Sequence, residues 1–389
     1  MLRTFGRRYE NGEPVCIETR GDRITAITPA WPHGPIADWP YVAPGLFDLQ
    51  INGHGGIWFS DEALTPPKVR QTVASYYKHG VTRMCPTLVT NSHEAIAAGV
   101  KAIREACEHD GWVNRMIPGI HIEGPYISAE DGARGAHPKE HVRPCDWNEF
   151  CQWQEISGQR IRLLTLAPEV PGAVEFTRQA TVSGVVISIG HTAATPEQIA
   201  AVVDAGATLS THLGNGSPAM IHRHRNHITA QLADPRLTTC LIADGCHLPA
   251  SVVSTMVRAK TPRQVVLTCD ASGYAGLPPG VYQSHWGANE ILEDGRLVVA
   301  GQRELLAGSA FESDICIPTI MDHAGVSLKD AIDMTSRNAA KCLGFEQARL
   351  RRGSLADLFL FRRQPGTRRL AVSATIAAGE LRYGELFSS

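Results

Sequence analysis

The sequence predicts an α/β fold, in which a (β/α)8 TIM-type barrel carries a small β-sandwich domain built from both ends of the chain. Short apolar runs alternate with helical patterns through the middle of the 389 residues. Eight such runs occur, whereas both ends contain short alternating segments separated by Gly, Asp and Pro. Eight buried strands that alternate with helices are typical of a closed barrel. An open doubly wound sheet is the alternative.

The candidate barrel strands are short, mostly apolar and bounded by turn or helix signals. They are residues 46–52, 82–88, 116–123, 161–167, 185–191, 208–213, 238–244 and 265–270.

Helix signals lie between these runs. In TPEQIAAVVDAG, Thr195 is an N-cap residue, Gln198 completes a capping box and Gly206 ends the helix. Asn91 opens a helix through AIAAGVKAIREA, and Ser327 opens one through KDAIDMTSRNAAKCLG. Strand and helix therefore alternate along the middle of the chain.

The two ends have a different pattern. The segments EPVCIETR and DRITAITPA near the start resemble SLADLFLFRR and RRLAVSATIAAGELRYG near the end, and both pairs indicate antiparallel β structure. We therefore expect residues 1–43 and 350–389 to form the small β-sandwich domain. Residues 44–349 form the barrel in this division.

The composition excludes several classes of protein. A hydrophobic fraction of 43%, 20% charged residues and a net charge of −2 give no bulk field for nucleic acid or membrane. The ten cysteines contain no CxxC pair, which favours reduced thiols. The start of the chain lacks the apolar core of a signal peptide, and no apolar run reaches the length of about 18 residues that a membrane span needs. The expected location is cytoplasmic.

Polar residues stand at the ends of the predicted strands, where barrel enzymes place catalytic groups. They are Asp48, Gln50, Asn52, Glu123, His191, His212, Asp244 and Asp270. One carboxylate and two imidazoles supply the ligands of a borderline divalent metal and leave a position for water. Taken singly, Glu123 suits a salt bridge and each histidine suits a backbone hydrogen bond. Their combination favours a metal centre.

Eight motifs, spread in order over nearly the whole barrel, resemble the N-acetylglucosamine-6-phosphate deacetylase family of the amidohydrolase superfamily. The motifs are PGLFDLQINGHGG (44–56), HIEGPYI (121–127), APE (167–169), IGHTAAT (189–195), THLGN (211–215), IADGCHLP (242–249), TCDASGYAG (268–276) and LAGSA (306–310). The resemblance implies a metal-dependent amidohydrolase. Its reaction would convert N-acetylglucosamine 6-phosphate to glucosamine 6-phosphate and acetate.

The resemblance also implies roles for single residues. Glu123, His191 and His212 would bind one divalent metal ion per chain, zinc or alternatively iron, and Asp270 would be the general acid and base. The residues implied in substrate binding are Ala136, His137, Asn215, Gly216, Arg223, Asp244, His247, Leu306, Ala307 and Gly308. Arg223 would grip the 6-phosphate across the interface of a homodimer, with His247 also near that interface.

Two departures from the family pattern bear on these expectations. Many superfamily members carry His-x-His on the first strand, where this chain has Gln50-Ile51-Asn52. Because amides are poor ligands beside imidazoles, we expect a mononuclear site. His54, close by in NGHGG, is a residue on which adventitious metal would bind.

The second departure is the loop GSPAMIHRHRNH, where the family usually has Ala-Met-Pro and one arginine. It gathers His222, Arg223, His224, Arg225 and His227. A solvated basic loop is the plainer interpretation. Its place beside the metal site favours an anion-binding loop, with the identity of the anion left open.

Three functions are therefore compatible with the sequence. The first is the amino-sugar phosphate deacetylase. The second is a metal-dependent amidohydrolase acting on another N-acyl sugar or an N-acyl amino acid. The third is a noncatalytic metal- and ligand-binding barrel, against which Asp270 argues because a binding protein needs no general base there.

Overall fold

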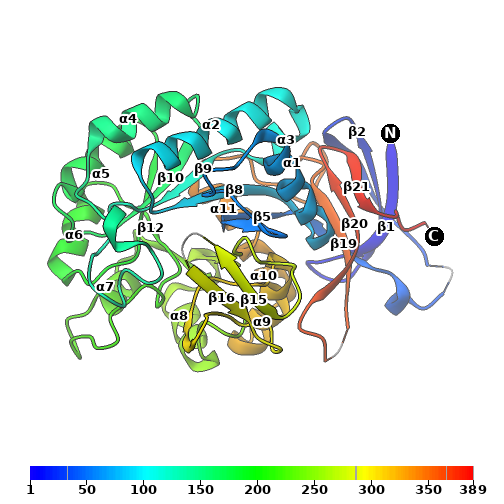
Figure 1. Cartoon of the computed structure of the whole chain (residues 1–389). Coiled ribbons are helices and arrows are strands. Elements are labelled where there is room, and N and C mark those ends of the chain that lie inside the picture. Colours follow the sequence, from blue (N-terminus) through cyan, green and yellow to red (C-terminus); the bar gives the residue numbers. More distant parts are fainter. Residues whose placement is uncertain (33, 285–286, 365, 389) are drawn as a thin grey trace.

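The central feature of the computed structural model is an eight-stranded parallel sheet surrounded by helices (Figure 1). The structure describes residues 1–32, 34–284, 287–364 and 366–388. The barrel strands are β5 (Leu46–Ile51), β8 (Val81–Val89), β9 (Ile120–Glu123), β10 (Ile161–Leu166), β11 (Val186–Ile189), β12 (Leu209–Ser210), β13 (Thr238–Ile242) and β14 (Val265–Thr268). They run side by side in this order, and a parallel bridge between Ile51 and Ala271 joins the first to the last. The predicted barrel is confirmed.

Eleven α-helices lie in the described part of the chain: α1 (Pro66–Ser75), α2 (His93–His109), α3 (Gly111–Met116), α4 (Trp147–Ile156), α5 (Ala173–Val182), α6 (Pro196–Asp204), α7 (His227–Ala233), α8 (Ala250–Lys260), α9 (Cys316–Ala324), α10 (Leu328–Met334) and α11 (Arg337–Cys342). The capping box of α6 is formed as predicted. The N-cap of α2 is Ser92 rather than Asn91, because the Ser92 hydroxyl accepts from the Ala95 amide. No described helix is long and apolar enough to cross a membrane.

The helix predicted over residues 329–344 is in fact two helices. The break falls between α10 and α11, where the hydroxyls of Thr335 and Ser336 donate to the Ala331 and Ile332 carbonyls. Hydroxyl groups that bond back to the preceding turn compete with the helix ladder and favour such a break.

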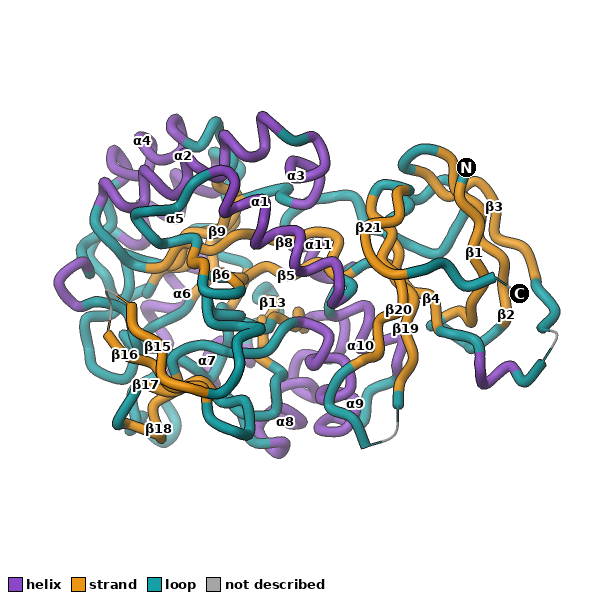
Figure 2. Tube along the Cα trace, turned by 45° about the vertical axis from the view of Figure 1, so that its right-hand side comes forward, coloured by secondary structure: helices purple, strands orange, loops and turns teal. Residues whose placement is uncertain are grey.

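Both ends of the chain join one mixed sheet of seven strands. In spatial order these are β21 (Glu380–Gly384), β20 (Leu370–Ala377), β19 (Leu358–Arg363), β4 (Tyr41–Pro44), β1 (Leu2–Arg8), β2 (Pro14–Arg20) and β3 (Arg23–Pro29). The antiparallel pair β4–β19 joins the N-terminal to the C-terminal strands (Figure 2). The predicted second component from both termini is thus present, and we refer to it as the terminal sheet.

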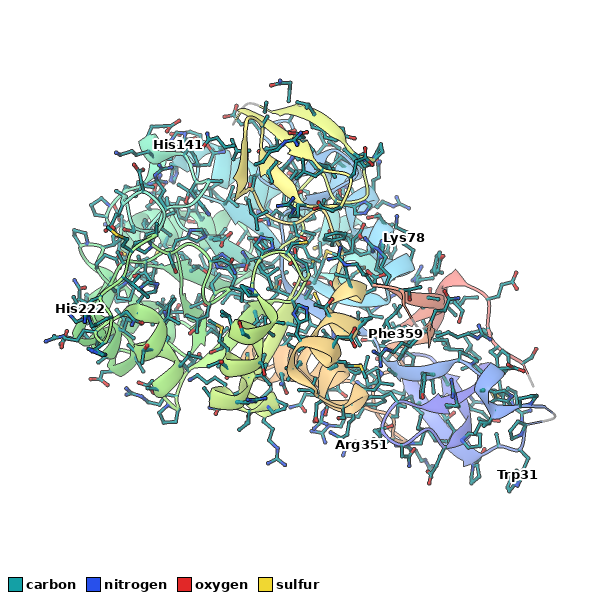
Figure 3. The ribbon with its side chains drawn as sticks, turned by 90° about the horizontal axis from the view of Figure 1, so that it is seen from below. Trp31, Lys78, His141, His222, Arg351 and Phe359 are labelled. Carbon is teal, nitrogen blue, oxygen red and sulfur yellow. The ribbon has the colours of Figure 1, made fainter. Side chains whose placement is uncertain are left out.

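The terminal sheet packs on the barrel near β8, and one hydrophobic core runs through both. Phe359 of β19 lies at this junction (Figure 3). A side chain at Gly80, just before β8, would come within 2.6 Å of the Phe359 ring. Thr375 of β20 donates to the Tyr77 carbonyl at 2.6 Å. Close backbone approach and direct hydrogen bonding therefore attach the terminal sheet to the barrel.

Two small sheets, which the sequence did not predict, lie over the carboxyl ends of the barrel strands. One is the hairpin of β6 (Gly53–His54) and β7 (Ile57–Trp58). The other comprises β15 (Gly280–Ser284), β16 (Gly287–Ile291), β17 (Leu297–Val299) and β18 (Gln302–Leu306), in that order. The second sheet delivers residues 306–309 beside Asp270, since the Ser309 amide donates to the Asp270 carbonyl at 3.1 Å.

Candidate metal centre and active site

Three predicted ligands meet at the mouth of the barrel. Glu123 ends β9, while His191 and His212 follow β11 and β12. The Oε1 atom of Glu123 lies 3.2 Å from Nε2 of His191 and 2.9 Å from Nε2 of His212, and the two nitrogens are 3.1 Å apart. All three side chains are buried. We call these three residues the mouth cluster.

The backbone is constrained at this cluster. Among the described non-glycine residues, positive φ occurs at Gln159, His191, His212, Thr261, Asp270 and Ala378. Half of these six belong to the proposed site, with φ of 50° at His191, 27° at His212 and 51° at Asp270. Such conformations cost roughly 1–3 kcal/mol each and persist where the surrounding structure holds them, which is typical of functional sites.

Hydrogen bonding places the metal-binding nitrogen of His191 toward the cluster. Its Nδ1 lies 3.0 Å from the Ala133 carbonyl and must donate to it, which leaves Nε2 with its lone pair facing Glu123. Burial alone would raise the pKa of Glu123, but its close contacts with the imidazoles of His191 and His212 hold it well below its usual range. The cluster is therefore a buried carboxylate with two imidazole nitrogens turned toward it, a donor set that fits a divalent cation.

Two amides occupy the positions of the missing His-x-His pair. Gln50 donates from Nε2 to Oε1 of Glu123 at 2.8 Å. Asn52 donates from Nδ2 to Oδ1 of Asp270, also at 2.8 Å. Each amide thus holds a carboxylate of the site. Asp48, two residues earlier, accepts instead from Thr268, Ser313 and the Cys269 amide, and so joins β5 to β14.

Asp270 has the ionisation expected of a general acid and base. Burial, and then the negative charge of Glu123, raise the pKa of Asp270 to about 7, although the hydrogen bond from Asn52 lowers it. A group with a pKa near the working pH can both accept and return a proton.

His137 lies beside the mouth cluster. Its ring centroid is 4.2 Å from that of His191, and its Nε2 is 4.0 Å from Oε2 of Glu123. Nδ1 is hydrogen-bonded to the Thr90 hydroxyl at 2.8 Å. Burial, and then the charge of His191, lower the pKa of His137 to about 3, so the free ring is neutral. Thr90 was not among the predicted site residues, although it directly follows a barrel strand.

The residues that follow β13 form a second wall. Asp244 accepts from Nδ1 of His247 at 2.8 Å, from the His247 amide at 3.0 Å and from Ser309 at 3.2 Å. Burial would raise the pKa of Asp244, but the hydrogen bond and charge of His247, together with the backbone amides of Cys246 and His247, outweigh it and bring the pKa to about 2. This buried carboxylate accepts from several donors and holds the His247 ring in place.

Three of the other predicted substrate-binding residues, Asn215, Gly216 and Gly308, lie close to His212, His191 and Asp270 respectively. A side chain at Gly216 would come within 2.7 Å of Nδ1 of His191. Gly308 has φ of 82°, and a side chain there would lie 3.5 Å from the Asp270 carbonyl. Asn215 donates to the His212 carbonyl at 3.2 Å. Ala136 is exposed, while Leu306 and Ala307 are half-buried.

The basic loop does not form one uniform cluster. His227 is buried and hydrogen-bonded to Ser217 at 2.8 Å, and Arg225 forms an ion pair with Glu197 of α6. Residues 222–224 are exposed, and Figure 3 shows His222 at the edge of the molecule. Within the described chain, the hydrogen bonds of residues 222–225 are with one another, with Asn226 and with Glu197 of α6. The structure thus does not bring Arg223 to the mouth cluster.

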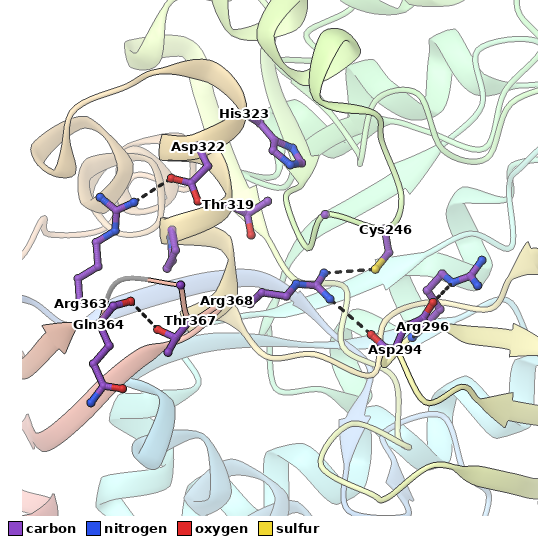
Figure 4. A pocket seen from close by; sticks show the side chains of 13 residues that line it. Cys246, Asp294, Arg296, Thr319, Asp322, His323, Arg363, Gln364, Thr367 and Arg368 are labelled. Carbon is purple, nitrogen blue, oxygen red and sulfur yellow. Dashed lines mark hydrogen bonds and ion pairs between the residues drawn. The ribbon is translucent and has the colours of Figure 1, made fainter.

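A polar cleft of ≈ 940 Å³ lies elsewhere, beside the β19–β20 connection (Figure 4). Its lining includes Arg363 paired with Asp322, and Arg368, which donates to the Asp244 carbonyl at 2.8 Å. None of the mouth cluster lines this cleft. Arg368 therefore connects the terminal sheet to the turn that carries His247.

A second buried group in the described chain also has the residue types of a metal site: His54, His79 and Glu312. We call it the junction cluster.

Comparison with known proteins supports the same chemistry. Residues 41–381 match the model of the Amidohydrolase family. The human N-acetylglucosamine-6-phosphate deacetylase is 33% identical over 87% of this chain and 83% of its own length. The N-acetylgalactosamine-6-phosphate deacetylase of Escherichia coli O157:H7 is 32% identical over 83% of each chain.

Solved structures agree in fold. The N-acetyl-D-glucosamine-6-phosphate deacetylase of Mycobacterium smegmatis superposes with a TM-score of 0.87 at 29% identity, covering 98% of this chain and 100% of that one. An aspartate-to-alanine mutant of that enzyme, in complex with N-acetyl-D-glucosamine 6-phosphate, gives a TM-score of 0.84 at 30% identity over 95% of this chain and 94% of that one.

Proposed function

The chain belongs to the Amidohydrolase family and, within it, to the N-acetylglucosamine-6-phosphate deacetylase family, and we propose that it hydrolyses the acetamide of N-acetylglucosamine 6-phosphate. The observation that carries this proposal is the position of Asp270 beside the mouth cluster, with an amide from Asn52 on its carboxylate. A relative is described in complex with this sugar phosphate.

We assign Glu123, His191 and His212 as the ligands of one divalent cation, most simply zinc, with iron as the alternative. Imidazole nitrogen and carboxylate oxygen suit such an ion, and the outer nitrogen of His191 is already fixed by the Ala133 carbonyl. When bound, the ion lowers the pKa of a coordinated water to about 7 and polarises the scissile carbonyl. Gln50 and Asn52 replace the ligands of a second ion, which supports a mononuclear site.

The protein's own groups then manage the protons. Asp270 accepts a proton from the attacking water and delivers it to the departing nitrogen, because an amine leaves more readily than an amide anion. Asn52 holds Oδ1 of Asp270 in place for both transfers. His137 is neutral, and in the tautomer whose Nδ1 accepts from Thr90, its Nε2–H is available to the oxygen that develops negative charge.

The remaining predicted contacts hold the sugar. His247, oriented by Asp244, and residues 306–308 flank Asp270 on one side, while Asn215 and Gly216 flank His191 on the other. Arg223, exposed in one chain, would reach the phosphate of a neighbouring subunit in a homodimer. We keep the dimer and the cytoplasmic location as part of the proposal.

A second candidate substrate is the C4 epimer, N-acetylgalactosamine 6-phosphate. The 32% identity to an enzyme named for that sugar is as high as the identity to several relatives named for the glucosamine compound. Both substrates need the same metal and the same acid and base, so they differ only in the groups that contact the sugar ring. An N-acyl substrate without phosphate is the further alternative.

Acetate release from N-acetylglucosamine 6-phosphate, its galactosamine epimer and unphosphorylated N-acetylglucosamine tests the proposal. We expect the highest kcat/KM for the first compound. Removal of metal with a chelator should abolish turnover, and added zinc or iron should restore it. Equal rates with phosphorylated and plain sugars would favour a different N-acyl substrate. No acetate from any of them would contradict the proposal and leave the noncatalytic barrel or a hydrolase of another N-acyl compound.

A further inference from the structure

The junction cluster has the composition of the mouth cluster but takes no part in the chemistry above. His54 belongs to β6, His79 ends the short helix η2 (Tyr76–His79), and Glu312 directly precedes η5 (Ser313–Ile315). The ligand atoms lie within 4.8 Å of one another. All three side chains are buried.

The geometry resembles a ligand set more than a set of paired side chains. In the mouth cluster, Oε1 of Glu123 faces two imidazole nitrogens. In the junction cluster, Oε1 of Glu312 also faces two, and it lies 3.0 Å from Nε2 of His54 and 3.4 Å from Nε2 of His79. Both distances are close to the spacing of about 3.4 Å between donors in a tetrahedral zinc site with bonds of about 2.1 Å, and all three ligand atoms lie within 4.8 Å of one another.

His79 supplies an independent observation. Each of its ring nitrogens lies within ion-pair distance of a carboxylate, but neither makes a hydrogen bond of acceptable geometry, although the side chain is buried. Buried polar groups without partners are rare in folded proteins, because an unsatisfied group costs roughly 1–3 kcal/mol. A cation on Nε2 would satisfy the nitrogen that faces Glu312.

An outer shell is also present. Oδ1 of Asp314 lies 3.2 Å from Nδ1 of His79, which is the carboxylate–histidine arrangement that commonly orients metal ligands. Arg369 contacts Oε2 of Glu312 at 2.7 Å and Oδ1 of Asp314 at 2.9 Å. The carboxylates of Glu312 and Asp314 carry two negative charges, and the Arg369 guanidinium neutralises only one of them. Either a protonated histidine or a bound cation would balance the other.

The space beside His54 is kept open by a glycine. An added Cβ at Gly276 would lie 2.6 Å from Nε2 of His54 and 3.5 Å from Oε1 of Glu312. Any side chain there would therefore press on the two donor atoms.

We propose that His54, His79 and Glu312 bind a second divalent cation of the zinc class, separate from the catalytic centre. Its role is structural. The ligands come from three distant segments of the barrel, and Arg369 enters from the β19–β20 connection of the terminal sheet. The ion would thus join the rim of the barrel to that sheet.

Metal analysis of the purified protein tests the proposal. Wild-type protein should retain about two equivalents of metal per chain after gel filtration, and His54→Gln should retain about one. The matched control is Tyr76→Phe. Tyr76 packs edge-on against His54 at 5.2 Å and donates to the Gly53 carbonyl, but it offers no ligand, so this variant should keep both equivalents.

Anomalous diffraction from wild-type crystals at the metal edge gives an answer that does not depend on whether a variant folds. Two peaks are expected, one of them about 2.0–2.2 Å from Nε2 of His54, Nε2 of His79 and a Glu312 oxygen. One peak, at the mouth cluster alone, would overturn the proposal. A second equivalent that gel filtration removes without changing Tm would mark an adventitious ion and would also overturn it.

The result is independent of the substrate assignment. Failure of every acetate-release assay would leave the second peak in place if the structural site is real. A second metal whose occupancy depends on Gln50 or Asn52 would instead indicate a binuclear catalytic centre.

Discussion

The mouth cluster and the junction cluster contain the same residue types, two histidines and one glutamate, in buried positions. Their surroundings differ. The mouth cluster has Asp270, with a pKa raised to about 7 chiefly by burial, and a neutral His137 beside it. The junction cluster has an arginine and a second carboxylate that are already paired. A ligand set alone therefore indicates metal binding, whereas the neighbouring acid, base and donors indicate catalysis.

Backbone conformation separates the two clusters as well. His191 and His212 both have positive φ, and so does Asp270. None of the three junction residues is among the described non-glycine residues with positive φ. Of the two clusters, only the mouth cluster carries this strain, which supports a functional demand there. Unstrained ligands suit a structural site.

Asp270→Asn should have the largest effect on turnover. A small effect would contradict the assignment of catalysis to the mouth cluster. The change removes proton transfer while it keeps the shape of the side chain, so we expect kcat to fall by about 10²- to 10⁴-fold with metal content retained. Steady-state kinetics with metal analysis of the same preparation measure this. Turnover close to wild type would show that Asp270 is not the acid and base.

Arg223→Ala sharpens the assignment of the mouth cluster to a phosphorylated sugar. Loss of a charge-assisted phosphate contact should cost about 2–4 kcal/mol of transition-state stabilisation with N-acetylglucosamine 6-phosphate, which lowers its kcat/KM. The kcat/KM of the unphosphorylated sugar should barely change. Arg225→Ala is the matched control with a smaller expected effect, because Arg225 already pairs with Glu197. Equal losses for both sugars would argue against a phosphate contact.

Asn52→Ala tests the side-chain amide that donates to the Asp270 carboxylate. The carboxylates at the junction cluster, Glu312 and Asp314, pair with Arg369 instead. The hydrogen bond from Asn52 lowers the pKa of Asp270, so its loss should raise that pKa. Because the ionised form is the base, kcat/KM of the free enzyme rises with pH through this pKa. The acid limb should therefore move to higher pH, with roughly a 10-fold loss on its acid side. A pH–rate profile with an unmoved acid limb would contradict this role.

His54→Gln should have the smallest effect on activity and would separate the clusters most cleanly. We expect kcat/KM to stay within about 3-fold of wild type, since no junction residue contacts the reacting groups. Tm should fall, because a bound cation stabilises the folded state by mass action. Thermal unfolding with and without a chelator measures the change. A large loss of kcat with unchanged Tm would place His54 in the catalytic machinery instead.

Much of the architecture could be predicted because it depends on local pattern. All eight barrel strands were expected close to their observed positions, since short apolar runs between helix caps define buried parallel strands. The expected meeting of Glu123, His191 and His212 followed from the same reasoning, because the carboxyl ends of barrel strands share one face. The domain boundaries and the role of each site residue remain predictions.

The amino-acid sequence by itself determined the barrel, the mixed sheet from both termini and the family to which the chain belongs. Tertiary structure alone decided which distant side chains meet. His54 and Glu312 are separated by 258 positions, and Gln50 reaches Glu123 across 73. No periodicity encodes such contacts, because they depend on how loops and sheets pack after the strands have formed. For the same reason, the sequence did not predict that Thr90 bonds to His137 or that the junction cluster forms. It also did not predict that Arg225 pairs with Glu197 instead of remaining available for an anion.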